Sequence, residues 1–177
     1  IIPEIRHRLI DLKYKYQNKV GEPRHNGSGK FWDGLELAST FDPNLWKYYT
    51  ANFMFDIVKS IIPTPYLFND QSVVKLPKSE FNFEPHFDNQ YGPDPEGALK
   101  GNFKTINCSW ILTNMNEANG CLFINDKPII ADVGDIVIID GNTVHYSGDN
   151  KTNGIRVFYN EEFKRNTSNI TGNLGGY

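Results

Sequence analysis

The chain has 177 residues, a formal net charge of −3 and 14% aromatic residues, enough for one domain with a substantial core. Its lysines and arginines are scattered, which argues against a basic surface that binds nucleic acid. No apolar run approaches the roughly 20 residues of a membrane helix, and the first residues lack the apolar core of a secretion signal. We therefore expect a single domain over residues 1–177, cytoplasmic, with neither nucleic acid nor membrane as a partner.

The N-terminal part, residues 1–62, is predicted to be helical. A first helix is expected over residues 3–17, where apolar side chains recur at helical spacing. A second is expected over residues 43–60, with Asp42 as its cap and a proline at its first position. The wide apolar stripe of this second helix is typical of a face that packs on a sheet.

From residue 65 the pattern changes to short apolar runs with a period of two, separated by Gly, Asn, Asp and Pro. Strands are predicted at residues 66–69, 71–76, 82–87, 104–113, 121–125, 128–131, 135–140, 143–147 and 154–160. Helices followed by many short strands are typical of an α+β chain with a β-sandwich or jelly roll, here over residues 65–162.

Three further expectations concern how these parts are arranged. Residues 136–139 are all apolar, so that strand is expected to be covered on both sides, with the N-terminal helices over the outer face of the sheet. The tail 164–177 is rich in Asn, Gly and Thr and is expected to be loose. Cys108 and Cys121 lie in apolar segments and are interpreted as buried reduced thiols, as in cytoplasmic proteins.

A candidate metal site consists of two histidines and one carboxylate. His86 and Asp88 are two residues apart, so on one strand they would point to the same side. His145 follows a Gly-Asp strand 59 residues after His86, which leaves room for the intervening strands of a jelly roll. Two imidazoles and one carboxylate are the ligands of a facial-triad iron(II) site. A His-x-Asp by itself is common on surface strands, so the prediction depends on the three residues together.

Two polar residues downstream are candidates for binding an anion. Arg156 lies in an otherwise apolar strand, and a buried arginine normally has a partner. It either holds a carboxylate, through one or two hydrogen bonds, or forms a local ion pair or points outward from an edge strand. Ser147 has the same parity as His145, but it could equally be a turn residue before Gly148.

Residues 89–103 begin directly after Asp88 and contain three glycines and two prolines, which makes regular structure unfavourable. Long loops within a compact domain are usually functional or disordered. We predict a lid in which Tyr91, Leu99 and Phe103 close over a substrate. The alternative is a solvated surface loop that does not contact substrate.

Residues 71–162 resemble the iron(II)/2-oxoglutarate-dependent oxygenases, most closely the phytanoyl-CoA dioxygenase-like branch. The residues that carry the resemblance are His86-Phe-Asp88, Trp110-Ile-Leu-Thr, Asn119-Gly-Cys-Leu-Phe123, Val133-Gly-Asp135-Ile-Val-Ile, His145-Tyr-Ser147 and Arg156. The resemblance implies a double-stranded β-helix (a cupin-like jelly roll) in which His86, Asp88 and His145 hold Fe(II). It further implies that Arg156, helped by Ser147, grips the distal carboxylate of 2-oxoglutarate, with Trp110 beside this co-substrate.

The implied activity is an O2-dependent hydroxylation of a small molecule or a peptide side chain. Related halogenases lack the carboxylate ligand, so Asp88 favours hydroxylation or desaturation over halogenation. The chain departs from the branch in lacking its Pro-Gly-Ser-His turn and in being short, which leaves a compact prolyl-hydroxylase-like oxygenase open. A cupin-like metalloenzyme that does not use 2-oxoglutarate and a jelly-roll binding module without catalysis also stay open, and neither needs Arg156 to face the metal.

Overall fold

The computed structural model describes residues 1–16, 34–36, 38–49, 52–80, 82–91, 96–97, 100 and 104–165. Its helices are α1 (Ile2–Tyr16), α2 (Ala38–Phe41), η1 (Pro43–Leu45), α3 (Trp46–Tyr49), α4 (Asn52–Ile61), η2 (Asp88–Tyr91) and η3 (Glu117–Asn119). Its strands are β1 (Gly34–Glu36), β2 (Pro65–Lys75), β3 (Phe83–His86), β4 (Thr105–Ile111), β5 (Leu122–Ile124), β6 (Lys127–Pro128), β7 (Ile136–Asp140), β8 (His145–Ser147) and β9 (Arg156–Arg165).

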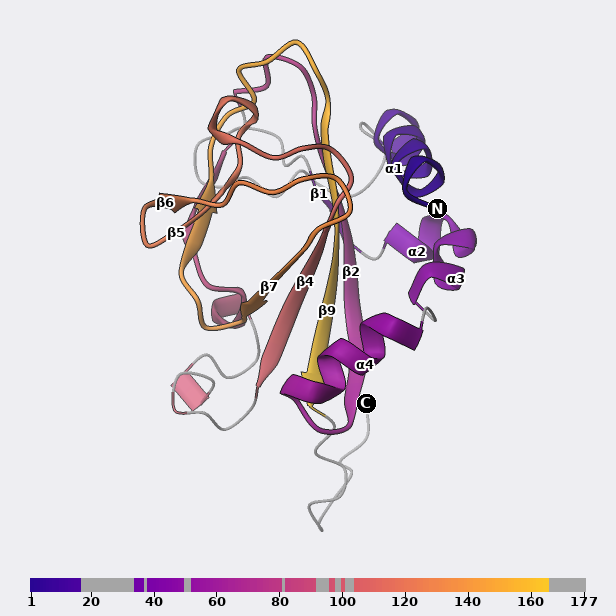
Figure 1. The fold of residues 1–177 in the computed structure, drawn as a ribbon, viewed down its shortest axis with the longest axis vertical. Coiled ribbons are helices and arrows are strands. Elements are labelled where there is room, and N and C mark those ends of the chain that lie inside the picture. Colours follow the sequence, from indigo (N-terminus) through magenta and orange to yellow (C-terminus); the bar gives the residue numbers. More distant parts are fainter. Residues whose placement is uncertain are drawn as a thin grey trace.

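The strands form two antiparallel sheets, as the alternation of short apolar runs predicted. The larger sheet has the order β1-β2-β9-β4-β7, and the smaller sheet has the order β3-β8-β5-β6. The helices α1 to α4 lie along one face of the larger sheet, and the smaller sheet lies on its other side (Figure 1). This is the α+β double-stranded β-helix that the sequence predicted, with the N-terminal helices on the outer face.

The core has two layers, one on each face of the larger sheet. Between helices and sheet, the period of α1 places Ile5, Leu9 and Leu12 against the strands β2 and β9. Between the two sheets, Val73, Ile111 and Phe158 of the larger sheet pack with residues of the smaller sheet and its connections. Alternate residues of β2, β4 and β9 therefore contribute to different layers.

Several predicted boundaries are corrected. The helix expected over residues 43–60 is described as a 3-10 turn (η1), α3 and α4, with residues 50–51 outside the described range. The strands expected at 66–69 and 71–76 are one strand, β2, whose register with β9 shifts between Leu67 and Asn69. Strand β6 is shorter than predicted, β9 continues to Arg165, and the short strand β1 was not predicted.

The expectation that residues 136–139 are covered on both sides is wrong. Strand β7 is at the edge of the larger sheet, and Ile138 is 36% exposed there, whereas Ile139 is 6% exposed. Ile136 still packs against the helix-side cluster, so only part of the outer face of this edge strand is covered. An apolar run in a sequence does not reveal that its strand will lie at an edge.

Both cysteines are buried and unpaired with each other, as predicted. Burial raises the pKa of the Cys108 thiol to about 12, with the nearby Glu161 contributing in the same direction. Within the described ranges, no helix has the length and apolar character needed to cross a membrane.

Candidate metal centre

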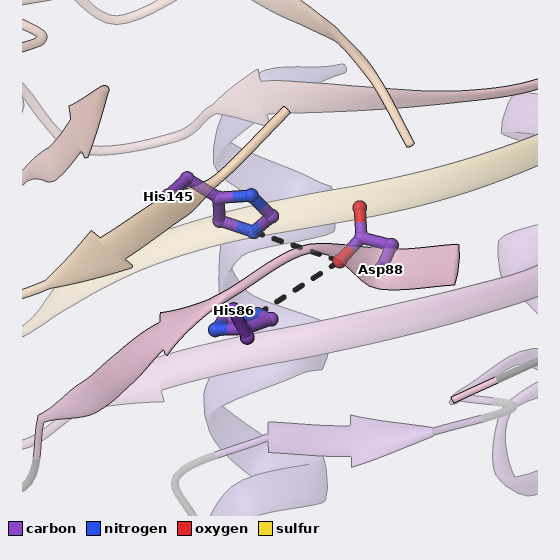
Figure 2. A group of neighbouring side chains, drawn as sticks. All are labelled: His86, Asp88 and His145. Atoms are coloured by element: carbon purple, nitrogen blue, oxygen red, sulfur yellow. Dashed lines mark ion pairs between the residues drawn. The ribbon is translucent and has the colours of Figure 1, made fainter. Parts of the chain in front are cut away.

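His86, Asp88 and His145 come together between the two sheets, with their functional groups pointing toward one another (Figure 2). One potential ligand atom from each residue lies within 4.8 Å of the other two. Asp88 Oδ1 is 3.8 Å from His86 Nε2 and 3.5 Å from His145 Nε2. Two imidazole nitrogens and one carboxylate oxygen at this spacing fit a divalent ion such as iron(II), with coordination positions left for other ligands.

The two histidines are held by strand pairing. His86 ends β3 and is the direct cross-strand partner of His145, the first residue of β8. Side chains of such partners lie on the same face of a sheet and close together. Asp88 was predicted to share a strand with His86, but it instead begins the 3-10 turn η2 that follows β3. The turn brings the carboxylate back toward both rings.

The orientation of both rings is fixed by backbone carbonyls. His86 Nδ1 lies 2.6 Å from the carbonyl oxygen of Glu84, and His145 Nδ1 lies 2.9 Å from that of Thr143. A proton on each Nδ1 satisfies the carbonyl and leaves Nε2 with the lone pair that a metal requires. Burial, reinforced by the neighbouring His145, lowers the pKa of His86, which favours the neutral, ligating form.

Asp88 is held by a residue that was not predicted from the sequence. Asn107 of β4 donates a hydrogen bond from Nδ2 to Asp88 Oδ2 at 3.2 Å. Asp88 Oδ1 is therefore the oxygen directed at the two histidines, and Oδ2 is held by the amide. Because Asn107 holds Oδ2, the arrangement favours monodentate coordination of a metal through Oδ1.

A second buried amide joins the two segments that supply the ligands. Asn89 accepts a hydrogen bond from Thr105 Oγ1 at 2.8 Å and donates one from Nδ2 to Asn142 Oδ1 at 2.8 Å. Its backbone N–H donates to the Gly141 carbonyl at 3.0 Å. A Cβ at Gly141 would overlap the Thr105 hydroxyl, so only glycine allows this close approach. The turn after Asp88 and the connection between β7 and β8, which precedes His145, are thus tied to each other and to β4.

A pair of buried cations lies on the inner face of the larger sheet, which faces the smaller sheet that carries the two histidines. Lys75 and Arg156 are cross-strand partners on β2 and β9, and they are 0% and 1% exposed. Lys75 Nζ donates to Ser147 Oγ at 2.9 Å and also to the Gly148 carbonyl. The Arg156 guanidinium lies over the Phe158 ring, 4.5 Å from its centroid.

Ser147 connects this cation pair to the metal ligands. It is 3% exposed and lies two residues after His145 on β8, on the same face. Its hydroxyl accepts from Lys75, so it is more than a turn residue before Gly148. The structure thus brings Ser147 and Arg156 together with a lysine that was not predicted.

Trp110 is not brought to this site, and its predicted place beside a co-substrate is wrong. Trp110 packs in the cluster between helices and sheet, whereas Asn107, three residues earlier on β4, faces Asp88. Residues three apart on a strand lie on opposite faces. For the predicted lid, Leu99, Phe103 and the side chain of Tyr91 lie outside the described residues, so the lid stays a prediction.

Some of the residues that were not predicted lie in recognisable sequence patterns. Lys75 follows two valines in a predicted strand, the same pattern that drew attention to Arg156. Asn107 and Ser109 alternate with Ile106 and Cys108, which indicates a polar face within a strand that is otherwise apolar. Nothing in the local sequence marks Asn89 as a bridge, because its partners come from distant segments.

No protein-family model matches the chain, and no curated protein matches it in sequence. Solved structures do resemble it. The non-heme alpha ketoglutarate dependent epimerase SnoN from nogalamycin biosynthesis is 15% identical, with a TM-score of 0.74 over 93% of this chain and 71% of that chain. EctD from S. alaskensis, crystallised with 2-oxoglutarate and 5-hydroxyectoine, is 12% identical, with a TM-score of 0.76 over 99% of this chain and 71% of that chain.

EvdMO1 is 18% identical, with a TM-score of 0.72 over 94% of this chain, and the chain spans only 44% of its length. At such identities the similarity is one of fold. The protein therefore has the double-stranded β-helix fold of the iron- and 2-oxoglutarate-dependent oxygenases, with a His-Asp-His cluster between its sheets.

Proposed function

We propose that this protein is an iron(II)- and 2-oxoglutarate-dependent dioxygenase that hydroxylates a small molecule. The observation that carries the proposal is the combination, between the two sheets, of the His86–Asp88–His145 cluster and the buried Lys75–Arg156 pair. The first fits a divalent metal, and the second fits a carboxylate. Ser147 lies between them in the fold.

The three ligand residues would hold iron(II) through two Nε2 atoms and Asp88 Oδ1. When bound, iron(II) with 2-oxoglutarate and O2 supplies the oxidant for a C–H bond, with succinate and carbon dioxide as by-products. The role of the chain is to fix the geometry. The Glu84 and Thr143 carbonyls set the two rings, and Asn107 sets the carboxylate.

The far carboxylate of 2-oxoglutarate would lie against Arg156, Lys75 and Ser147. A guanidinium offers paired donors to a carboxylate, and a buried ammonium adds charge at low dielectric. Two residues along a strand span about 7 Å, so Ser147 lies about that far from His145 along β8. This is of the same order as an extended five-carbon dicarboxylate, which could therefore reach from the metal to the cations.

Hydroxylation is the outcome that Asp88 favours. A carboxylate ligand occupies the position that a halide needs on iron in related halogenases, so we expect hydroxylation or desaturation with chloride ignored. Solved structures of the same fold include an epimerase and a carbocyclase, so other outcomes of C–H oxidation belong to the same chemistry. Formation of a chlorinated product by the unmodified protein would contradict the assignment.

The buried cation pair argues against the two hypotheses that involve no 2-oxoglutarate. A cupin-like protein that uses no 2-oxoglutarate, or a binding module without catalysis, has no need for two cations buried beside the ligand cluster. A buried guanidinium and a buried ammonium on neighbouring strands favour an anionic ligand. A dicarboxylate co-substrate is such a ligand.

The test is aerobic turnover of 2-oxoglutarate by the iron(II)-loaded protein, with succinate measured across a panel of small molecules. We expect iron-dependent succinate formation that some members of the panel stimulate. The Arg156→Gln variant serves as the control, since it should lose this turnover while keeping the metal. Succinate formation that does not depend on iron, or that Arg156→Gln leaves unchanged, would overturn the proposal.

A further inference from the structure

The inner face of the larger sheet carries polar side chains beside Asp88. One cross-strand row consists of Asn107 on β4, Glu162 on β9 and Asn69 on β2, which are register partners. The neighbouring row consists of Ser109, Asn160 and Gln71 on the same three strands. Polar residues in the interior of a domain are normally hydrogen-bonded, so the partners of each row indicate what it does.

The row of Ser109 is satisfied within itself. Ser109 Oγ donates to Asn160 Oδ1 at 2.6 Å, and Asn160 Nδ2 donates to Gln71 Oε1 at 3.3 Å. These bonds join three strands across the sheet. This row therefore has a structural explanation.

The row of Asn107 is different. Asn107 is 5% exposed, and its Nδ2 is committed to Asp88. Its carbonyl oxygen Oδ1 is buried, and no donor of the described residues reaches it. Because Nδ2 and Oδ1 share one carbon, this acceptor lies within a few ångström of the Asp88 carboxylate. A buried acceptor without a donor costs roughly 1–3 kcal/mol, which a ligand with a donor would recover.

Glu162 adds acceptors next to Asn107. It is half-buried, and its Oε1 accepts a hydrogen bond from Asn69 Nδ2 at 3.1 Å. A carboxylate has about four acceptor sites, so it can accept hydrogen bonds from more than one donor. As direct cross-strand partners, Asn107 and Glu162 lie side by side. Together they form a wall that accepts hydrogen bonds near the metal ligands.

We infer that Asn107 Oδ1 and the Glu162 carboxylate bind the substrate by accepting hydrogen bonds from it. The substrate is then a hydroxyl- or amine-bearing small molecule, such as a polyol or an amino alcohol, with a donor close to the C–H bond that is oxidised. Purely apolar acyl chains and fully alkylated analogues are rejected, because they would leave these acceptors buried without donors. This inference rests on the proposed function and adds the substrate class to it.

The experiment measures binding to the protein loaded with redox-inert Zn(II) and 2-oxoglutarate, by ligand-observed NMR. The probes are matched pairs that differ in their donors: cyclohexanol and methoxycyclohexane, cyclohexylamine and methylcyclohexane, and methyl glucoside and its fully O-methylated form. We expect the donor-bearing member to bind at least about tenfold more tightly in one or more pairs. Equal binding within every pair, or no binding of any donor-bearing probe at its highest soluble concentration, would overturn the inference.

Variants test whether Asn107 and Glu162 cause the preference for donor-bearing probes. In Asn107→Leu the affinity ratio between the donor-bearing and the donor-free member of a pair should fall to about one. Glu162→Gln should weaken binding of the amine more than binding of the alcohol, because the negative charge is lost. Ser109→Ala is the matched control, since its hydroxyl is already paired, and the ratio should persist. A preference that persists in Asn107→Leu would also overturn the inference.

Two further measurements distinguish failure of the substrate inference from misfolding of a variant and from failure of the proposed function. Circular dichroism and Zn(II) binding establish that Asn107→Leu is folded, and the ratios in the parent protein test the inference without any variant. Binding of Zn(II) and 2-oxoglutarate by the parent tests the proposed function. A parent that binds both but shows no donor preference contradicts only the inference about substrate.

Discussion

Strands β2 and β9 carry two buried pairs of like ionisable groups, one pair on each face of the larger sheet. On the inner face, Lys75 is the cross-strand partner of Arg156, and on the outer face Asp70 is the partner of Glu161. All four side chains are buried, at 0–3% exposure. The same two strands thus bury two cations toward the metal ligands and two carboxylates under the helices.

The two pairs are compensated by different means. Asp70 accepts hydrogen bonds from the Ser39 backbone and hydroxyl and from the Tyr159 hydroxyl. Burial, with Asp70 nearby, raises the pKa of Glu161 to about 8, so this carboxyl group is largely protonated at neutral pH. The carboxylate pair is compensated within the fold, by hydrogen bonds and a proton.

A cation pair that contains arginine has no such route, because a guanidinium does not release its proton in a protein. Its compensation has to come from an anion. The outer pair is therefore a structural feature of the helix–sheet interface, whereas we propose that the inner pair serves a carboxylate of 2-oxoglutarate. Variants on the inner face should therefore change ligand binding more than stability. Variants on the outer face should change stability more than ligand binding.

The largest difference is expected between two aspartates. Asp88→Ala should lower iron(II) affinity by about a hundredfold or more and leave the stability of the metal-free protein nearly unchanged. Asp70→Ala should keep iron affinity and lose roughly 2–4 kcal/mol of stability, because three hydrogen bonds are lost. Anaerobic iron titration and denaturant unfolding of both variants measure this. Tight iron binding by Asp88→Ala would show that the triad is misassigned.

The second difference concerns the co-substrate. Arg156→Gln should weaken 2-oxoglutarate binding by about a hundredfold or more, since losing one partner of a buried charged pair costs roughly 3–5 kcal/mol. Iron affinity should change little. Lys75→Gln should act in the same direction, and Glu161→Gln on the outer face should leave 2-oxoglutarate affinity unchanged. Calorimetric titration of the iron-loaded variants under anaerobic conditions distinguishes them.

A smaller effect is expected from the link between the ligand segments. Asn89→Ala removes hydrogen bonds to Thr105 and Asn142, so both ligand segments gain freedom. Iron(II) affinity should fall about tenfold, as is usual for residues that orient metal ligands. Asn142→Ala removes only one of these bonds and should have a weaker effect. Equal iron affinities in the parent and Asn89→Ala would mean that the link is not needed to hold the ligands.

The smallest effect on function is expected from Glu161, whose role is in stability. Its pKa is raised to about 8 in the folded protein from an ordinary value of 4.5, so between these values the folded state binds more protons than the unfolded state. The free energy of unfolding should therefore fall as pH rises through this window and level off above about pH 8. Glu161→Gln should flatten that fall without altering activity. A parent protein whose stability rises with pH over the same window would contradict this.

The sequence was most informative where chemistry and periodicity agree. His86, Asp88, His145, Ser147 and Arg156 were all identified as candidates, and the structure places them between the two facing sheets. The helices over the outer face also followed from their apolar stripes. In these cases residue type and local spacing carry the information.

Errors arose where the answer depended on neighbours distant in sequence. Trp110 was assigned by resemblance, although its alternation with Asn107 and Ser109 places it on the opposite face. Ile138 is partly exposed because β7 is an edge strand, a property of strand order that no local pattern contains. Lys75 was missed because its hydrogen-bond acceptors, Ser147 Oγ and the Gly148 carbonyl, lie 72 and 73 residues away along the chain.

The central claim is that the buried cation pair and the triad together bind 2-oxoglutarate at a metal. An anaerobic calorimetric titration of 2-oxoglutarate into the protein, with and without iron(II), tests it most directly. We predict one bound 2-oxoglutarate per chain, tighter with iron than without, and loss of most of that affinity in Arg156→Gln. Absence of 2-oxoglutarate binding to the iron-loaded parent, or binding that neither iron nor Arg156→Gln alters, would contradict it.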